Sequence, residues 1–319
     1  MPDIVFCDGL LPKIDGVTLC RTLKKDVAMG SVPFVLMSSS DELLQRAYEL
    51  GVGAEAYLPK ESSGERIVRR LLDLSVPLRR VASRLAKGGR VRGRLSGLSA
   101  YSVLDLVCKH RKSARFSLRD SSRNFEIEIR GGRPVCAALA EASGGTLSGA
   151  EVFDALVAVG MGRFDVQDVS DDDHVQVELS GSLQDLVTAS LARIRAAQSL
   201  LAGSSLVGVQ AVEFNDLERR VCFDAIPAVD RELLGQIQKG ASPRELIVTG
   251  QAPASQVEAV LCDVARRGAI RGVILCDGTD ALPQAMDCQR ALLRGEADYG
   301  AALDAHRGSV AALLASAPR

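Results

Sequence analysis

Short apolar runs alternate with amphipathic segments over the first 75 residues of the chain. Each run is continuous, short and bounded by polar residues, which predicts buried strands, and the segments between and after the runs have the spacing of helices. The strands are expected at 2–7, 33–37 and 54–58. The helices are expected at 17–26, 41–50 and 64–74, the second capped by the serines 38–40. This alternation indicates an α/β fold with a parallel sheet.

The next stretch, residues 76–95, is basic and contains no acidic residue. Its cations are Arg79, Arg80, Arg84, Lys87, Arg90, Arg92 and Arg94. We interpret it as a basic linker, either a solvated connector or one face of a helix. The alternative, a patch that binds a polyanion, is the less favoured of the two.

Residues 96–175 have a different pattern, with a predicted helix at 100–110 and another that Ser148 caps and that runs to about 159. Strands are expected at 114–118, 125–129, 134–137 and 162–166. The second of these strands alternates strictly between apolar and polar residues, so one of its faces should be solvated. The pair Gly131-Gly132 suits a tight hairpin of the primed type. The region therefore predicts an α+β domain.

The remainder of the chain is predicted to be mainly helical. A long helix is expected at 182–202, and capping boxes at Ser242–Glu245 and Ser255–Glu258 begin two shorter helices, of which the second should stop at Gly268. Together with a helix at 229–239 and a strand-like run ending at Leu275, they suggest a winged-helix-like module. The expected domains are 1–75, a basic linker 76–95, 96–175, a long helix and connector 176–228, a module 229–275 and an Ala-rich tail 276–319.

Composition narrows the class of protein. The net charge is −1, 47% of the residues are hydrophobic, and Trp is absent. A balanced charge disfavours bulk electrostatic binding to nucleic acid or to an anionic membrane. No apolar run reaches the length of a membrane span, no signal peptide is visible, and the eight cysteines form no C-x-x-C pair. We therefore expect a cytoplasmic protein with reduced cysteines and no membrane partner.

Three polar residues follow the three strands of the first region. Asp8 closes the first strand, Ser38 ends the second, and Lys60 follows the third. The carboxyl ends of parallel strands form the crevice in which such folds bind ligands. A carboxylate, a hydroxyl and an ammonium group suit an acyl phosphate, with Asp8 attacking a phosphoryl group whose oxygens Ser38 and Lys60 hold.

These spacings, together with Pro12, Gly16 and Tyr57, resemble the receiver domain of bacterial response regulators from its third strand onward. The resemblance implies a partial doubly wound, flavodoxin-like domain. By the same resemblance Asp8 is the phospho-acceptor, Ser38 the switch hydroxyl, Tyr57 the switch aromatic and Lys60 the phosphate-sensing lysine. It also implies a two-component system in which a sensor histidine kinase is the upstream partner.

The chain departs from this family at its beginning. The family's first strand carries an acidic pair that binds Mg²⁺, and the chain begins almost at the third strand. Only Asp8 and the Leu10 carbonyl remain as metal ligands, so we expect Mg²⁺ only if an upstream acidic pair exists. We further expect Met1 to be an internal methionine of a longer protein and the chain as given not to be phosphorylated. Pro59 precedes Lys60, where the family has a proline after the lysine, so we expect a different loop here.

Residues 92–167 resemble the PATAN domain, an interaction module found attached to receivers. The matching features are the segment 93–98, the helix to Lys112, the strand 125–129 with its glycine pair, and Gly162-Arg163-Phe164. This resemblance implies binding of a downstream protein, and it brings no catalytic residue.

We therefore predict a response regulator or adaptor that acts through protein–protein interaction and is not an enzyme. The alternative is a DNA-binding transcriptional regulator that uses the winged-helix-like module. Its candidate recognition helix, Gln256–Arg267, has no net charge, whereas groove-binding helices need excess positive charge. We therefore do not expect DNA to be a partner. The acidic run Asp171–Asp173 with His174 is interpreted as a solvated loop, with a metal cluster as the less favoured alternative.

Overall fold

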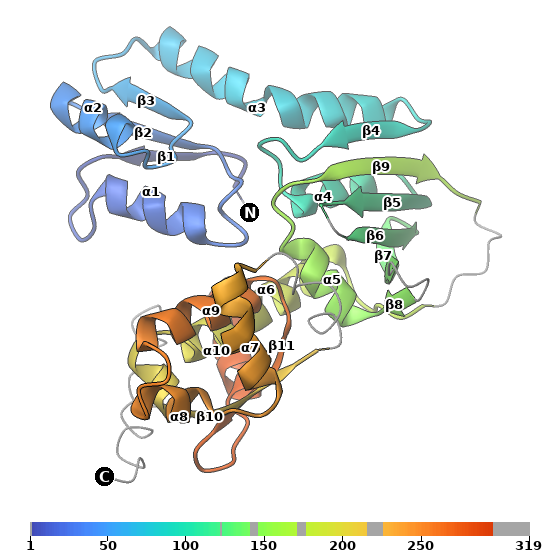
Figure 1. The fold of residues 1–319 in the computed structure, drawn as a ribbon. Helices are drawn as coiled ribbons and strands as arrows, with labels where there is room; N and C mark the ends of the chain where they lie inside the picture. Colours follow the sequence, from blue (N-terminus) through green and yellow to red (C-terminus); the bar gives the residue numbers. More distant parts are fainter. Residues whose placement is uncertain (1, 122, 141–145, 171–176, 216–225, 296–319) are drawn as a thin grey trace. The chain divides into compact units, whose positions relative to one another are not determined.

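The computed structural model describes residues 2–121, 123–140, 146–170, 177–215 and 226–295 (Figure 1). The chain divides into two compact units, each described by itself. The first comprises Met1–Val135 and Val159–Gln176, and the second comprises Cys136–Ala158 and Val177–Arg319.

A three-stranded parallel sheet begins the first unit. Its strands are β1 (Val5–Asp8), β2 (Phe34–Ser38) and β3 (Ala56–Pro59), in that order across the sheet. Cys7 lies opposite Leu36, and Leu36 lies opposite Tyr57. The strands and the helices between them lie within a few residues of their predicted positions, because buried apolar runs and polar caps determine both kinds of element.

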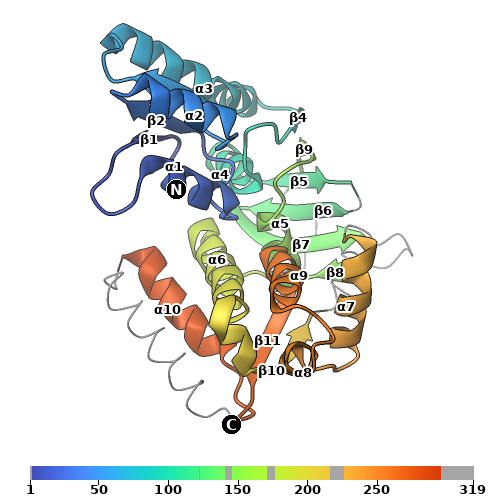
Figure 2. The same ribbon diagram turned by 60° about the vertical axis from the view of Figure 1, so that its left-hand side comes forward.

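Helices cover both faces of this sheet (Figure 2). Helices α1 (Gly16–Lys25) and α2 (Asp41–Glu49) pack on one face, around a cluster that includes Cys20, Phe34 and Leu44. Helix α3 (Gly64–Ala86) packs on the other face, where Ile67, Leu71 and Leu74 contact Val35, Ala56 and Leu58. The Ser40 hydroxyl caps α2 by accepting the Leu43 N–H, as predicted.

Helix α3 is longer than predicted. The expected end at residue 74 is wrong, since the helix continues through Pro77 to Ala86. Near the proline, Ser75 and Arg79 donate side-chain hydrogen bonds to the Leu72 carbonyl. Val81 and Leu85 in the second half of the helix are buried. The free energy gained by burying these side chains outweighs the helix-breaking tendency of proline. Part of the basic stretch 76–95 is therefore helix.

An antiparallel sheet forms the rest of the first unit. Its strands within this unit run in the order β4 (Val91–Arg94), β9 (Arg163–Asp168), β5 (Ala114–Arg119) and β6 (Asn124–Arg130). One face buries apolar side chains such as Phe116, Phe164 and Ile127, and helix α4 (Ala100–His110) packs nearby. Strand β4 was not predicted. Three of its four residues are Arg92, Gly93 and Arg94, so the run shows no clear alternation of apolar and polar residues.

The glycine pair after β6 has the predicted geometry. Gly131 and Gly132 both have positive φ, as a primed turn requires. Strand β7 (Arg133–Ala140) follows this turn, and in the second unit its later residues pair with β8 (Thr146–Ser148). Helix α5 (Ala150–Val157) begins at Gly149, with no side-chain cap. The prediction that Ser148 caps this helix is wrong, because its hydroxyl donates to Glu178 at 2.8 Å.

The second unit is mainly helical, with a two-stranded antiparallel sheet of β10 (Val209–Phe214) and β11 (Ile270–Leu275). Helices α6 (Leu183–Leu200) and α10 (Leu282–Arg294) lie side by side (Figure 2). A short helix η1 (Gly203–Gly208) precedes β10. Three helices lie between β10 and β11 in the sequence. They are α7 (Ala228–Gln238), α8 (Pro243–Val248) and α9 (Ala254–Arg266).

The two predicted capping boxes have different outcomes. The Ser242 hydroxyl accepts the Glu245 N–H and caps α8, which confirms the cap but only one of the two hydrogen bonds of the predicted box. The second prediction is wrong, because Pro253 is the N-cap of α9 and Ser255 lies inside its first turn. The stop at Gly268 is confirmed, since this glycine has φ +76° just after the helix.

Three predicted features lie wholly or partly outside the described residues. They are the acidic run Asp171–Asp173 with His174, part of the connector before residue 226, and the tail beyond residue 295. Among the helices that are described, none combines the length and the apolar character needed to cross a membrane.

Candidate functional site

Asp8 and Lys60 meet at the carboxyl edge of the parallel sheet. Asp8 is the last residue of β1, and Lys60 directly follows β3. The Lys60 Nζ lies 2.5 Å from the Asp8 Oδ2, and the Lys60 backbone N–H donates to the Ser38 carbonyl at 2.9 Å. The second hydrogen bond holds the lysine against the end of the middle strand. The sequence spacing of these residues therefore corresponds to a contact in space.

The Asp8 carboxylate is ionised and accessible. Its Oδ1 accepts the Leu10 N–H at 3.0 Å, and 30% of the side chain is exposed. The hydrogen bond from Lys60, followed by the backbone hydrogen bond from Leu10, lowers the pKa of Asp8 below its ordinary value. A carboxylate held in this form at the end of a strand is a competent nucleophile for a ligand that reaches the sheet edge.

Two glycines allow the chain to fold back against Asp8. A Cβ added at Gly16 would lie 2.2 Å from the Asp8 carbonyl oxygen, so no other residue fits there without a shift. A Cβ at Gly9 would lie 2.9 Å from Leu43 Cδ2. The Gly16 N–H donates to the Gly9 carbonyl at 3.0 Å and closes the loop. The predicted glycine eight residues after Asp8 therefore has a steric cause.

Ser38 and Tyr57 lie near the pair but contact other groups. Ser38 is fully buried at the end of β2, where its Oγ accepts the Ser40 N–H at 3.0 Å. Tyr57 lies on β3, and its ring packs edge to face with Tyr48 at 5.7 Å. Burial raises the pKa of the Tyr57 phenol. The structure thus joins Asp8 and Lys60 directly and places Ser38 on the adjoining strand, while Tyr57 packs against α2.

The residues described at this edge do not form a complete Mg²⁺ site. Across the described part of the chain, no group of three or more His, Cys, Asp or Glu side chains could hold a metal ion. Both Asp8 oxygens already contact donors, namely Lys60 and the Leu10 N–H. Mg²⁺ prefers several oxygen ligands, so Asp8 and the Leu10 carbonyl are too few. Their role as metal ligands remains a prediction.

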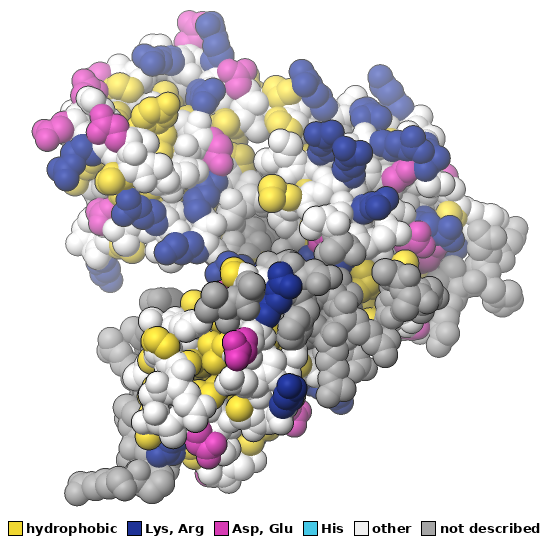
Figure 3. All heavy atoms as spheres, viewed as in Figure 1, with side chains coloured by type: hydrophobic (Ala, Val, Ile, Leu, Met, Phe, Trp, Pro, Cys, Tyr) yellow, Lys and Arg dark blue, Asp and Glu magenta, His cyan; other side chains and the backbone are white. Residues whose placement is uncertain are grey.

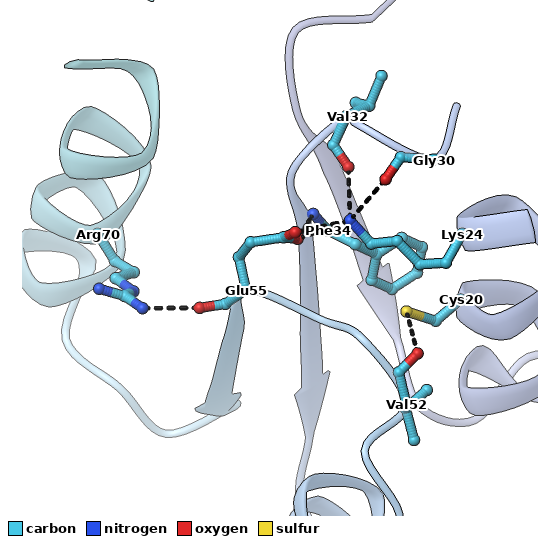
Figure 4. A network of polar contacts seen from close by, with 8 residues as sticks. All are labelled: Cys20, Lys24, Gly30, Val32, Phe34, Val52, Glu55 and Arg70. Atoms are coloured by element: carbon cyan, nitrogen blue, oxygen red, sulfur yellow. Dashed lines mark hydrogen bonds and ion pairs between the residues drawn. The ribbon is translucent and has the colours of Figure 1, made fainter. Parts of the chain in front are cut away.

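A second polar network lies at the opposite, amino-terminal end of the same strands (Figure 4). Lys24 Nζ lies 2.7 Å from the Glu55 carboxylate and also donates to the Val32 and Gly30 carbonyls. The other Glu55 oxygen accepts the Phe34 N–H at 2.6 Å. Arg70 donates from α3 to the Glu55 carbonyl at 2.7 Å. We did not predict this network, because no spacing rule links a helix lysine to a loop glutamate.

A buried carboxylate in the second unit was also not predicted. Asp154 on α5 is 4% exposed, and its Oδ1 accepts the Ser190 hydroxyl at 2.5 Å. Arg193 Nε lies 3.1 Å from Oδ2, yet these two atoms lack hydrogen-bond geometry. Burial raises the pKa of Asp154 to about 6, against the lowering effects of Arg193 and Ser190. In sequence, Asp154 stands inside an apolar helix pattern, which gave no reason to single it out.

Comparison with known proteins gives an independent assignment of the first region. Residues 1–72 match the response regulator receiver domain family. Protein PilG of Pseudomonas aeruginosa is 36% identical over 67 residues, which cover 21% of this chain and 50% of PilG. The response regulator PleD of Caulobacter vibrioides is 32% identical over 103 residues, which cover 31% of this chain and 22% of PleD.

A third relative is the phosphate regulon transcriptional regulatory protein PhoB of Pseudomonas aeruginosa. It is 33% identical over 70 residues, which cover 22% of this chain and 31% of PhoB. The chain thus spans half or less of these relatives. The similarity to response regulators of two-component systems therefore concerns the first region of the chain. The resemblance of residues 92–167 to a PATAN domain remains a prediction.

Proposed function

We propose that this chain is a response regulator or adaptor whose phospho-acceptor position is Asp8 and whose output is the binding of a protein partner. The observation that carries the proposal is the contact between Asp8 and Lys60 at the carboxyl edge of a parallel sheet. It lies within residues 1–72, the part that matches the receiver family. The upstream partner in this proposal is a sensor histidine kinase.

The chemistry is the transfer of a phosphoryl group to a carboxylate. An Asp8 oxygen attacks phosphorus, the bond from phosphorus to the donor breaks, and an acyl phosphate forms on the aspartate. The Lys60 ammonium then lies beside the added negative charge and compensates it. The Ser38 hydroxyl, whose Oγ now accepts the Ser40 N–H, is the second group that could donate to a phosphoryl oxygen.

In this proposal, phosphorylation of Asp8 changes the surface of the domain through a movement of Tyr57. This side chain lines a hollow of 510 Å³ beside β3, together with Tyr48 of α2 and Arg66, Arg69 and Asp73 of α3. If Ser38 moves toward a phosphoryl group, the space beside β3 changes and the Tyr57 ring can turn inward. The shape and charge of this hollow would then differ between the two states.

The output is proposed to be protein binding through residues 92–167, as a PATAN-type domain would provide. DNA binding through the second unit is the alternative, and the charges on α9 do not favour it. Arg266 and Arg267 both pair with Asp263 on their own helix, at 3.6 and 2.8 Å. Groove-binding helices present uncompensated cations to phosphate, which α9 does not.

Phosphorylation is tested by incubating the protein with acetyl phosphate and Mg²⁺ and measuring its intact mass. The 319-residue chain should gain no stoichiometric phosphoryl adduct, because no group of three or more His, Cys, Asp or Glu side chains among the described residues could hold the Mg²⁺ ion that the transfer needs. A chain extended by the in-frame codons upstream of Met1 should gain one adduct if those codons encode an acidic pair. Asp8→Ala should abolish that adduct, whereas Asp3→Ala, which removes an exposed aspartate before the other end of β1, should retain it.

Two results would contradict the proposal in different ways. An adduct on the 319-residue chain that disappears in Asp8→Ala would confirm the acceptor and refute the expected inactivity. An adduct on the extended chain that survives Asp8→Ala would refute the acceptor itself.

A further inference from the structure

The solvated face of the antiparallel sheet carries a row of three arginines. Alternate residues of β4, β9 and β5 point away from the core, and the strand register places Arg94 opposite Arg163 and Arg163 opposite Arg119. All three side chains are exposed. Directly opposed residues on neighbouring strands have their Cβ atoms about 5 Å apart. The row therefore crosses three strands with like charges in adjacent positions.

This row is not compensated within the described residues. Arg94, Arg119 and Arg163 make no ion pair with any carboxylate that the structure describes. Like charges directly opposite each other destabilise a sheet, and arginine cannot relieve the repulsion by losing its proton. The row therefore weakens the folded state unless an anion binds to it.

The neighbouring row on the same face is balanced. Arg92 lies opposite Asp165, and Asp165 lies opposite Ser117. Arg90 and Arg92 both contact the Asp165 carboxylate, at 2.5 and 3.0 Å, and the Arg90 contact is the main cause of the lowered pKa of Asp165. The sheet thus pairs arginine with carboxylate in one row and leaves the arginines of the next row free for a ligand.

The surface is hollowed at this place. A depression of 520 Å³ is lined by Arg90, Arg92, Arg119, Arg163 and Asp165, among others. Figure 3 shows Lys and Arg side chains gathered over the region where Figure 1 places the end of α3, β4 and β9. The hollow contains four arginines and one aspartate, so its lining is strongly positive.

We propose that the row Arg94, Arg163 and Arg119 binds an acidic peptide segment of a protein partner. With strands about 4.8 Å apart, the row is roughly 10 Å long, which matches three to four residues of an extended chain. Each guanidinium can bind one carboxylate in the two-pronged geometry. This inference goes beyond phosphoryl transfer and does not depend on Asp8.

A nucleic acid fits this face less well. Glu126 and Glu128 point from β6 to the same face as Arg119, and with Asp165 they interrupt any longer positive track. No aromatic side chain of β4, β5, β6 or β9 lies on the solvated face, since Phe116, Phe125 and Phe164 are buried in the core. Stacking on aromatic residues is the usual source of affinity for single strands.

The test uses the full chain and a fluorescein-labelled hexaglutamate peptide, with binding followed by fluorescence anisotropy at low salt. Arg163→Gln should weaken binding at least tenfold, because it removes the middle cation of the row. Arg119→Gln should weaken binding in the same direction. The matched control is Arg115→Gln, because Arg115 lies on the same strand and face but is already paired with Glu128 at 2.5 Å. The control should bind the peptide as the unchanged chain does.

Thermal unfolding gives a second readout. Without peptide, the melting temperature of Arg163→Gln should equal or exceed that of the unchanged chain, because the substitution removes two like-charge contacts. A melting temperature that falls, a lack of measurable peptide binding by the unchanged chain, or an equal loss of binding in Arg115→Gln would overturn the proposal. Tighter binding of a hexathymidylate oligonucleotide than of hexaglutamate would also overturn it, in favour of a nucleic-acid ligand.

Discussion

The two ends of the small parallel sheet each carry a contact between a lysine and a carboxylate, with different surroundings. At the amino end, Lys24 lies 2.7 Å from Glu55, and the lysine side chain is 14% exposed. At the carboxyl end, Lys60 lies 2.5 Å from Asp8, and the lysine side chain is 43% exposed. The distances alone would suggest that the two pairs have the same role.

Their remaining partners distinguish the two pairs. Lys24 and Glu55 also bond three backbone groups, which are the Val32 and Gly30 carbonyls and the Phe34 N–H. Asp8 receives the Leu10 backbone N–H, and among the described residues the Lys60 ammonium contacts no other carboxylate or side-chain acceptor than Asp8. A charged group whose bonding capacity is filled by the fold stabilises it, whereas one with capacity left over can bind a ligand.

The largest effect is expected at Asp154, a carboxylate with less access to water than either pair. Its folded pKa of about 6 lies above the ordinary aspartate value, so the folded state favours the protonated form. The resulting stability is fully present below about pH 4 and is lost as the pH rises through 6. Over this window the free energy of unfolding should fall by roughly 3 kcal/mol, from 1.36 kcal/mol per pKa unit.

Urea denaturation at several pH values measures this loss. Asp154→Asn keeps a partner for Ser190 and cannot ionise, so its free energy of unfolding should change less between pH 4 and 6 than that of the unchanged chain. Asp185→Asn is the control, because the Ser182 hydroxyl lowers the pKa of Asp185 and its contribution has the opposite sign. Equal pH dependence in the unchanged chain and Asp154→Asn would show that Arg193 compensates the burial.

The next effect tests the amino end. Glu55→Ala removes the partner of a mostly buried lysine and leaves the Phe34 N–H without its acceptor, so it should lower the free energy of unfolding by about 2 kcal/mol. The control, Glu65→Ala, breaks an exposed pair with Arg69 on α3 and should change it by less than about 0.5 kcal/mol. Urea denaturation of both variants is the measurement. Similar losses in the two variants would remove the distinction between the ends of the sheet.

The smallest effect on stability is expected at the carboxyl end. Lys60→Ala should change the free energy of unfolding by less than about 0.5 kcal/mol, because the pair is exposed. The same substitution should raise the pKa of Asp8 toward its ordinary value, since Lys60 is the main cause of the lowering. Titration of the Asp8 carboxyl carbon by NMR measures the shift. An unchanged pKa together with a large loss of stability would make this pair structural.

The receiver region was predictable because its features depend on short sequence distances. Asp8, Ser38 and Lys60 each follow an apolar run, and parallel strands bring such positions to one edge. Gly16 could be recognised by its spacing from Asp8 in the resemblance to receiver domains, and the structure supplies the steric reason, since a Cβ there has no room beside Asp8. The continuation of α3 past Pro77 could not, because it depends on Val81 and Leu85 being buried by residues distant in sequence.

Contacts that depend on register or burial were not predictable either. The row Arg94, Arg163 and Arg119 exists only because β4 and β5 both pair with β9 in one alignment. In sequence, Arg94 belongs to a basic stretch and the other two are isolated cations. The network around Glu55 likewise depends on how α1 and α3 dock on the sheet, which hydrophobic periodicity does not specify.

The number of residues in helix α3 determines the direction in which the side chains at its two ends point. The helix is tied at Arg70 to the loop before β3 and at Arg84 to the Arg92 carbonyl on β4. Each residue of an α-helix turns the chain by about 100°, so the separation of 14 positions between Arg70 and Arg84 sets an angle as well as a length. One residue inserted between them would point Arg84 away from β4, whereas an insertion of seven, close to two full turns, would nearly restore its direction. The number of residues in α3 is therefore constrained by helical phase.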